Sequence, residues 1–163
     1  MRFFLILLAS LMMFSPAHAG TPFGQSKYSK IERIKSDFKN TVKDGKLKIV
    51  IDLSDQRMVV KRTGHRDLTW IISSGARGYE TPKGTYKPQR LFERYYSKTY
   101  DDAPMHWAVF FHGGYAIHQT GTLLGMGTPQ SHGCIRLAPH RAARLFKWVQ
   151  AYGRSRTSIV VQA

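Results

Sequence analysis

The chain of 163 residues is poor in cysteine and in acidic residues, and both shortages restrict what it can be. A single cysteine excludes a disulfide within the chain and a zinc site closed by several cysteines. Only 10 acidic residues accompany 25 lysines and arginines, so the formal net charge is +15. Such a surplus is typical of proteins that bind nucleic acid, an anionic membrane face or an acidic polymer.

Long apolar runs are scarce as well, and none approaches the ~20 residues needed to span a bilayer. The chain opens with Met1-Arg2 and an apolar run over 3–14, and Ala17 and Ala19 then have the spacing of a signal-peptidase site. We therefore expect residues 1–19 to be a signal peptide, rather than a buried helix or an uncleaved anchor. No cysteine follows the cleavage site, so a lipoprotein anchor is not expected. The predicted location is the periplasm or cell envelope.

Export would change how the net charge and the single cysteine are interpreted. Removal of residues 1–19 leaves a formal charge of +14, because only Arg2 is lost. An exported protein meets little nucleic acid, and the chain has no zinc-finger, RNA-recognition or helix-turn-helix signature. We expect no nucleic-acid partner, but electrostatic contact with an anionic envelope. An unpaired cysteine in an oxidising compartment is a candidate reactive thiol.

The mature chain divides into a basic N-terminal segment over 20–45 and a domain over 46–163. In the first segment, apolar residues recur at helical spacing and predict a helix over 29–43. This helix either rests on the domain or forms a basic arm toward anionic wall or lipid. The apolar residues are Ile31, Ile34, Phe38 and Val42.

The domain is predicted to be mainly β with one or two helices, as a β-sandwich or barrel rather than a parallel α/β sheet. One helix is predicted to begin at Pro139 and to end near Gly153. The first two predicted strands form a hairpin. The predicted strands are 47–53, 57–61, 68–73, 107–112, 115–118 and 157–161.

The only cysteine lies in the run Ser131-His132-Gly133-Cys134-Ile135-Arg136-Leu137. A thiol becomes a good nucleophile when a nearby base or cation lowers its pKa, and a neighbouring strand can supply a histidine for this. Gly133 allows a tight turn that aims N–H groups at an oxyanion. These residues indicate a cysteine–histidine acyltransferase or hydrolase. Two alternatives are a metal site of His118, His132 and Cys134, and a buried structural cysteine.

This run, with Ile117-His118 upstream, resembles the signature of the L,D-transpeptidase catalytic domain family of the YkuD type. Two further segments agree: 81–86 resembles the TPxGxF/Y segment of the family, and 113–118 its glycine-led strand into the histidine. The resemblance covers about residues 46–162 and implies the β-sandwich/barrel-like fold of that family. One position departs from the pattern, since Gln119 stands where the family usually has Gly or Ser. Its larger side chain is expected to narrow the acceptor side of the site.

The resemblance also implies a mechanism on peptidoglycan stem peptides. Cys134 would be the nucleophile and His118 the general base, held in one tautomer by the Gln119 carbonyl. The N–H groups of Gly133 and Cys134 would form the oxyanion hole. The thioester would pass to a stem amine to give 3-3 cross-links, to water as in an L,D-carboxypeptidase or endopeptidase, or to a lysine of an envelope protein. No cofactor and no metal are expected.

Four residues near the motif are candidates for substrate binding: His132, Arg136, Ser131 and Tyr115. His132 either tunes the thiolate or is structural, and Arg136 either binds a substrate carboxylate or braces the loop. Ser131 would hydrogen-bond the loop or the base, and Tyr115 is more typical of a core. The segment 90–105 is predicted to form a loop beside the cleft. A non-enzymatic, basic envelope-binding protein is the competing hypothesis, and the oligomeric state stays open.

Overall fold

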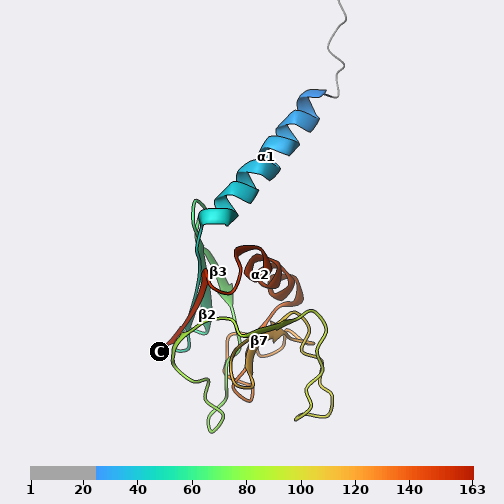
Figure 1. Ribbon diagram of the computed structural model, residues 1–163. Helices are drawn as coiled ribbons and strands as arrows, with labels where there is room; N and C mark the ends of the chain where they lie inside the picture. Colours follow the sequence, from blue (N-terminus) through green and yellow to red (C-terminus); the bar gives the residue numbers. More distant parts are fainter. Residues whose placement is uncertain (1–24) are drawn as a thin grey trace, which may run out of the picture. The chain divides into compact units, whose positions relative to one another are not determined.

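The computed structural model describes residues 25–163 (Figure 1). The predicted signal peptide, residues 1–19, lies outside the described residues. The chain divides into two compact units, Met1–Lys35 and Ser36–Ala163, and each is considered by itself. In the described part of the chain, no helix is both long and apolar enough to cross a membrane.

Helix α1 spans Gln25–Asp44, four residues longer at its start than the predicted helix. In the first unit, the side chains of Ile31 and Ile34 are 39% and 58% exposed. In the second unit, Val42 belongs to the hydrophobic core. The helical periodicity therefore corresponds to a real helix, but its apolar positions have different surroundings along its length.

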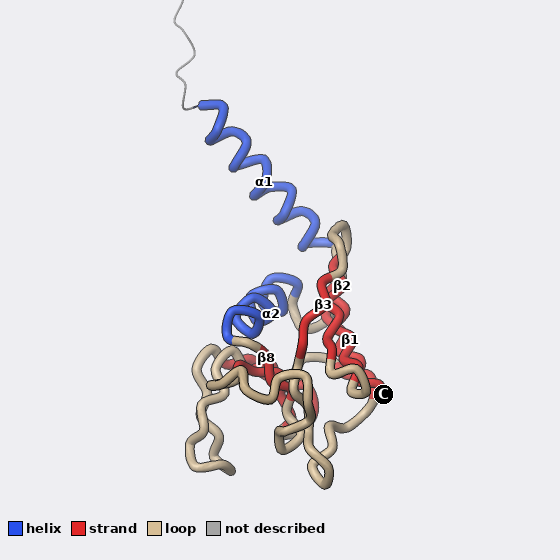
Figure 2. Tube along the Cα trace, turned by 180° about the vertical axis from the view of Figure 1, so that it is seen from behind, coloured by secondary structure: helices blue, strands red, loops and turns tan. Residues whose placement is uncertain are grey.

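The second unit contains two mixed β-sheets, whose strands are red in Figure 2. The five-stranded sheet has the order β3-β2-β1-β9-β4, and the four-stranded sheet has the order β5-β6-β7-β8. The strands are β1 (Leu47–Asp52), β2 (Arg57–Arg62), β3 (Leu68–Ile71), β4 (Gly84–Tyr86), β5 (Arg90–Phe92), β6 (Ala108–His112), β7 (Tyr115–Gln119), β8 (Ile135–Leu137) and β9 (Thr157–Gln162).

The mainly β fold is confirmed, but two pairings differ from an antiparallel sandwich. Strands β1 and β2 form the predicted antiparallel hairpin. Strand β9 pairs in parallel with β1, and β8 pairs in parallel with β7. Strand β8, within the cysteine motif, was not predicted, because three residues give too short a run for a period-2 signal. The sheets are therefore mixed, and the second parallel pair carries the functional site.

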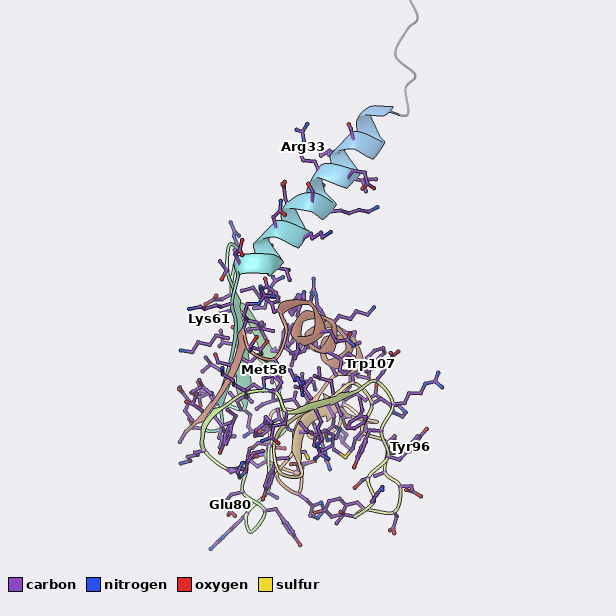
Figure 3. All side chains as sticks on the ribbon, in the orientation of Figure 1. Arg33, Met58, Lys61, Glu80, Tyr96 and Trp107 are labelled. Carbon is purple, nitrogen blue, oxygen red and sulfur yellow. The ribbon has the colours of Figure 1, made fainter. Side chains whose placement is uncertain are left out.

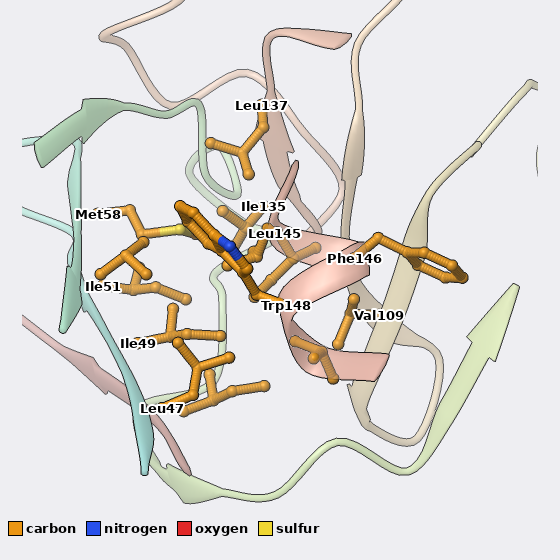
Figure 4. Packing of buried hydrophobic residues seen from close by; sticks show 14 of the residues in the cluster. Leu47, Ile49, Ile51, Met58, Val109, Ile135, Leu137, Leu145, Phe146 and Trp148 are labelled. Carbon is orange, nitrogen blue, oxygen red and sulfur yellow. The ribbon is translucent and has the colours of Figure 1, made fainter. Parts of the chain in front are cut away.

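The core lies between the sheets and helix α2 (Pro139–Tyr152). Alternate side chains of β1 are fully buried, namely Leu47, Ile49 and Ile51. In Figure 4 these face Leu145 and Trp148 of α2. Burying each such side chain contributes about 1.5–3 kcal/mol relative to exposure, so this packing holds the helix on the sheet.

Helix α2 has the predicted start and end. Pro139 occupies its first turn, where a missing N–H costs nothing, and Gly153 at φ 82° donates its N–H to the Val149 carbonyl. The helix contacts β1 of one sheet and β6 and β7 of the other. It therefore fixes the position of β7, the strand on which His118 lies.

Candidate active site

The pairing of β7 with β8 brings the histidine and the cysteine motif together. His118 is opposite Arg136 in the parallel register. Paired residues of adjacent strands point to the same face of a sheet, and so do residues two apart. Cys134 precedes Arg136 by two residues, and all three side chains line one cavity of about 510 Å³.

His118 is buried, with 7% of its surface exposed. Its Nδ1 lies 2.6 Å from the Gln119 carbonyl oxygen. A carbonyl only accepts, so Nδ1 carries the proton and Nε2 holds the free lone pair. Burial lowers the pKa of His118 to about 4; the Gln119 carbonyl opposes this shift and Arg136 adds to it. At neutral pH the imidazole is therefore an uncharged base.

Cys134 is partly buried, and its Sγ lies 3.9 Å from the Gly114 carbonyl oxygen. Burial raises the pKa of the thiol above its ordinary value of 9.0. The Ala116 N–H and the positive charge of Arg136 act in the opposite direction but are outweighed. The expected lowering of the thiol pKa is therefore not seen, and the resting pair is a neutral thiol beside a neutral imidazole.

Ser131 closes the loop that carries the cysteine. Its hydroxyl donates to the Cys134 carbonyl at 2.5 Å and accepts from the Gly133 N–H at 3.0 Å. The Gly133 N–H, which was predicted to form part of the oxyanion hole, is thus hydrogen-bonded within the loop. Ser131 is 2% exposed and acts as a brace, although it also reaches the cavity wall.

Gly133 is required for its backbone geometry. Its φ is +99°, and a Cβ atom there would overlap the Tyr115 ring at Cε1. Tyr115 packs against the main core, stacks on His112 with ring centroids 6.1 Å apart, and does not line the cavity. Its predicted contact with substrate is therefore not seen; the ring is a neighbour of the glycine instead.

His132 lies between two tyrosine rings. It stacks on Tyr100 with ring centroids 4.7 Å apart and an interplanar angle of 21°, and it meets Tyr79 edge-on at 4.4 Å. It also lines the cavity. His132 therefore joins the cysteine motif to the segment that contains Tyr100.

That segment follows β5 and flanks the cavity, as predicted. Its turn is held by Ser97, whose N–H donates to the Ala103 carbonyl and whose hydroxyl accepts from two backbone N–H groups. The part of the cavity wall that it supplies consists of Tyr95, Ser97, Lys98, Thr99, Tyr100, Ala103, Pro104 and Met105.

Arg136 presents its side chain to the cavity. Its backbone is anchored, because its N–H and carbonyl both bond to Ser73. Within residues 25–163, the guanidinium has no ion-pair partner and no side-chain hydrogen bond. The loop is thus braced through the Arg136 backbone, and the charge is free to meet a carboxylate.

The segment after β3 is hydrogen-bonded to the cysteine loop. The Thr81 hydroxyl donates to the Gly133 carbonyl at 2.9 Å and accepts from the Gly75 N–H at 3.0 Å. Thr81 opens the segment 81–86 and is 3% exposed. The segment therefore contributes a buried hydrogen bond to the backbone at the site.

A buried polar network next to the cysteine loop was not predicted from the sequence. The buried Gln56 side chain donates to the Ser74 hydroxyl at 2.7 Å and accepts from the Ser74 N–H at 2.9 Å. The Ser74 carbonyl accepts from both Gln130 and Ser131, and the Ser73 hydroxyl donates to Thr128. Gln56, in a turn at φ +49°, had no local signal for burial.

Metal ligation was the alternative for these histidines and the cysteine. In the part of the chain that the structure describes, no three or more His, Cys, Asp or Glu side chains are grouped to hold a metal ion. His132 is instead engaged in ring contacts, and His118 in its bond to Gln119.

Comparison with known proteins identifies the family. The model of the L,D-transpeptidase catalytic domain, YkuD, matches residues 46–161, so the chain belongs to this family. The Bacillus subtilis protein YciB, which carries the provisional name of an L,D-transpeptidase, is 29% identical over 69% of this chain. The chain spans 64% of the length of YciB.

Solved structures show the same fold. An L,D-transpeptidase from Mycobacterium smegmatis has a TM-score of 0.63 and 23% identity over 73% of this chain and 59% of its own. L,D-transpeptidase 3 from Mycobacterium tuberculosis, with a faropenem-derived adduct, has a TM-score of 0.60 and 22% identity over 73% of this chain and 61% of its own. The mainly β fold with two helices is thus that of L,D-transpeptidase catalytic domains.

Proposed function

We propose that this protein is a peptidoglycan L,D-transpeptidase that forms 3-3 cross-links through a thioester on Cys134. One observation carries the proposal. A buried, neutral His118, whose Nδ1 is held by the Gln119 carbonyl, lines the same cavity as the thiol. A nucleophile, a base and a third group that orients the base are the elements of a catalytic triad.

In the first step, Cys134 Sγ attacks the carbonyl that joins the third stem residue to D-alanine. His118 Nε2 takes the thiol proton as the C–S bond forms. The Cys134 N–H is the oxyanion donor, a contribution of about 10²- to 10³-fold in rate. The C–N bond then breaks, and His118 gives the proton to the amine of the departing D-alanine, leaving the thioester.

In the second step, the side-chain amine of a neighbouring stem attacks the thioester carbonyl. His118 accepts a proton from that amine as the new C–N bond forms. The C–S bond then breaks, and His118 returns the proton to Sγ to regenerate the thiol. A neutral imidazole is needed for each proton uptake, which fits a base whose pKa burial lowers to about 4.

Stem peptides carry carboxylates, and the cavity supplies cations to meet them. Arg136 lines the cavity together with the thiol. Arg90 on β5 and Lys98 in the segment after β5 line it as well. Arginine matches carboxylate geometry with two parallel hydrogen bonds. We propose that the protein acts in the periplasm or cell envelope, where residues 1–19 would direct it and its positive charge would favour the acidic wall.

Incubation with disaccharide-tetrapeptide followed by mass spectrometry tests the proposal. The expected product is a dimer that lacks one D-alanine, and Cys134→Ala should abolish it. Free tripeptide without dimer would assign an L,D-carboxypeptidase to the same site. Attachment of a lysine-bearing envelope protein would assign the anchoring reaction. Tetrapeptide consumption by Cys134→Ala at the wild-type rate would overturn all three.

A carbapenem provides an independent readout of the nucleophile. Since L,D-transpeptidase 3 from Mycobacterium tuberculosis was solved with a faropenem-derived adduct, we expect a β-lactam of the penem or carbapenem class to acylate Cys134 here. Intact mass should rise by one drug equivalent in the wild type and stay unchanged in Cys134→Ala. A basic envelope-binding protein without catalysis would show no adduct.

A further inference from the structure

A second cavity, of about 600 Å³, lies in the same unit but shares no lining residue with the cysteine site. Figure 3 shows Lys61, which lines this cavity, on the opposite side of the domain from Tyr96, which lies on the segment flanking the cysteine site. Among the described residues, its lining includes six cationic residues and no acidic one: Lys46, Lys48, Lys61, Arg62, Lys87 and Arg156.

The register of the five-stranded sheet places these cations side by side. Lys48 on β1 is opposite Lys61 on β2 and opposite Ser158 on β9. Like charges directly opposite each other on adjacent strands destabilise a sheet. The arrangement is therefore costly in the free protein, and a bound anion would relieve it.

Acidic side chains of the protein neutralise few of these positive charges. Of the six cations, only Lys61 has a carboxylate partner in the described part of the chain, Asp67 at 3.0 Å. Arg62 differs from the other five, because it is opposite the inward-facing Leu47 and its guanidinium lies 4.0 Å over the Trp148 ring, on the core side of the sheet. Burial and the charge of Arg144 both lower the pKa of Arg62. In the described part of the chain, four lining cations therefore have no carboxylate partner: Lys46, Lys48, Lys87 and Arg156, whose Nε donates to the Tyr152 carbonyl.

Residues with hydroxyl groups also line the cavity. Thr63, Ser155 and Ser158 line it, and the Thr63 hydroxyl already binds the Lys46 N–H at 2.9 Å. Each internal phosphate of a polyphosphate chain carries one negative charge and two free acceptor oxygens, and lysine, arginine and hydroxyl groups are the usual partners of phosphate. A single carboxylate would leave most of these cations unmatched.

We propose that this cavity binds an inorganic polyphosphate chain. This site is independent of the reaction at Cys134. A membrane surface fits less well, because interfacial sites pair cations with exposed apolar side chains that insert into lipid. None of the exposed large apolar residues of the described chain lines the cavity.

Calorimetric titration of the full chain with long-chain inorganic polyphosphate tests the proposal. The double variant Lys48→Gln/Lys87→Gln removes two exposed cavity cations and should weaken binding at least about tenfold. The matched control, Arg141→Gln/Lys147→Gln, removes the same charge from α2 and should change the affinity less than about threefold. Circular dichroism melting confirms that both variants are folded.

Four further measurements test the site: orthophosphate binding, salt dependence, the Lys98→Gln variant and binding to anionic vesicles. Orthophosphate should bind at least about a hundredfold more weakly than the polymer, and salt should weaken polymer binding steeply. An equal loss in both double variants would mean general attraction and would overturn the site. A larger loss in Lys98→Gln would place the anion in the cysteine cavity instead. Tighter binding to vesicles of anionic lipid than to polyphosphate would also overturn the proposal.

Discussion

The Thr81 hydroxyl donates a hydrogen bond to the Gly133 carbonyl across 52 positions of the sequence, at 2.9 Å. This bond links the glycine- and proline-rich segment after β3 to the residue directly before the cysteine. The Thr81 oxygen also accepts the Gly75 N–H, so one buried side chain holds two loops together. The position of the Cys134 backbone depends on this junction.

We expect Thr81→Val to disturb the cysteine loop. The substitution leaves a buried carbonyl and a buried N–H without partners, at about 1–3 kcal/mol for each unsatisfied group. The free energy of unfolding, measured in urea, should fall by this order, and the rate of Cys134 acylation should fall at least about tenfold. Thr81→Ser keeps the hydroxyl and should retain most of both. Wild-type acylation in Thr81→Val would show that the bond has no role in positioning the thiol.

Gly133→Ala tests the backbone requirement at the site. The new methyl group would overlap the Tyr115 ring, and φ +99° is strained for any residue with a Cβ atom. We expect a loss of about 1–3 kcal/mol of stability and of most acylation activity. Gly121→Ala is the control, because its methyl group would meet no atom within 4 Å. The prediction fails if thermal melting finds both variants equally stable.

The pH dependence of alkylation distinguishes a neutral pair from a thiolate–imidazolium pair. Since burial raises the pKa of Cys134, the rate of reaction with iodoacetamide should rise about tenfold per pH unit between pH 6 and 9. A preformed ion pair would instead give a fast plateau over this range. Peptide mapping confirms that the label is on Cys134.

Arg136 should influence this reaction through its charge. It lowers the pKa of the thiol, so Arg136→Gln should raise that pKa and slow alkylation about three- to tenfold at fixed pH. Arg136→Lys retains the charge and should stay close to the wild type. With stem peptide as substrate, a lost carboxylate contact would appear as a higher KM in Arg136→Gln. Identical alkylation rates in all three proteins would show that the guanidinium does not act on the thiol.

His118 should make stability depend on pH. Its pKa is about 4 in the folded protein against 6.5 when unperturbed, so between these values the unfolded chain binds more protons. Stability is therefore full above about pH 6.5 and is lost as the pH falls toward 4, by up to about 3 kcal/mol. His118→Gln removes this contribution. The difference in unfolding free energy between wild type and variant should shrink across that range, and a constant difference would contradict the assignment.

Sequence patterns predicted the helices and strands whose formation depends on interactions over a few residues. The β-branched runs became strands and the Pro139–Gly153 segment became a helix, because side-chain periodicity and capping act over a few residues. The parallel pairing of β1 with β9 was not predicted, since it joins the two ends of the domain and leaves no local trace. It is decided by packing of the whole core.

The same division applies to the site. Cys134 and His118 were found from a motif, and the register of β7 and β8 places them in one cavity. The engagement of the Gly133 N–H by Ser131 depends on the loop conformation, which residue types alone do not specify. The burial of Gln56 against Ser74 depends on how a turn packs against a distant strand. Such features depend on the three-dimensional packing of segments that are far apart in the sequence.

Strand β9 follows all the other strands in the sequence, yet it lies between β1 and β4 in the five-stranded sheet. A nascent chain that lacks these residues leaves β4 without a partner strand, leaves β1 paired only with β2, and lacks the buried side chains of Ile159 and Val161. The five-stranded sheet can therefore close only after residues 157–162 have been synthesised, because the parallel pairing of β9 with β1 joins segments about a hundred residues apart.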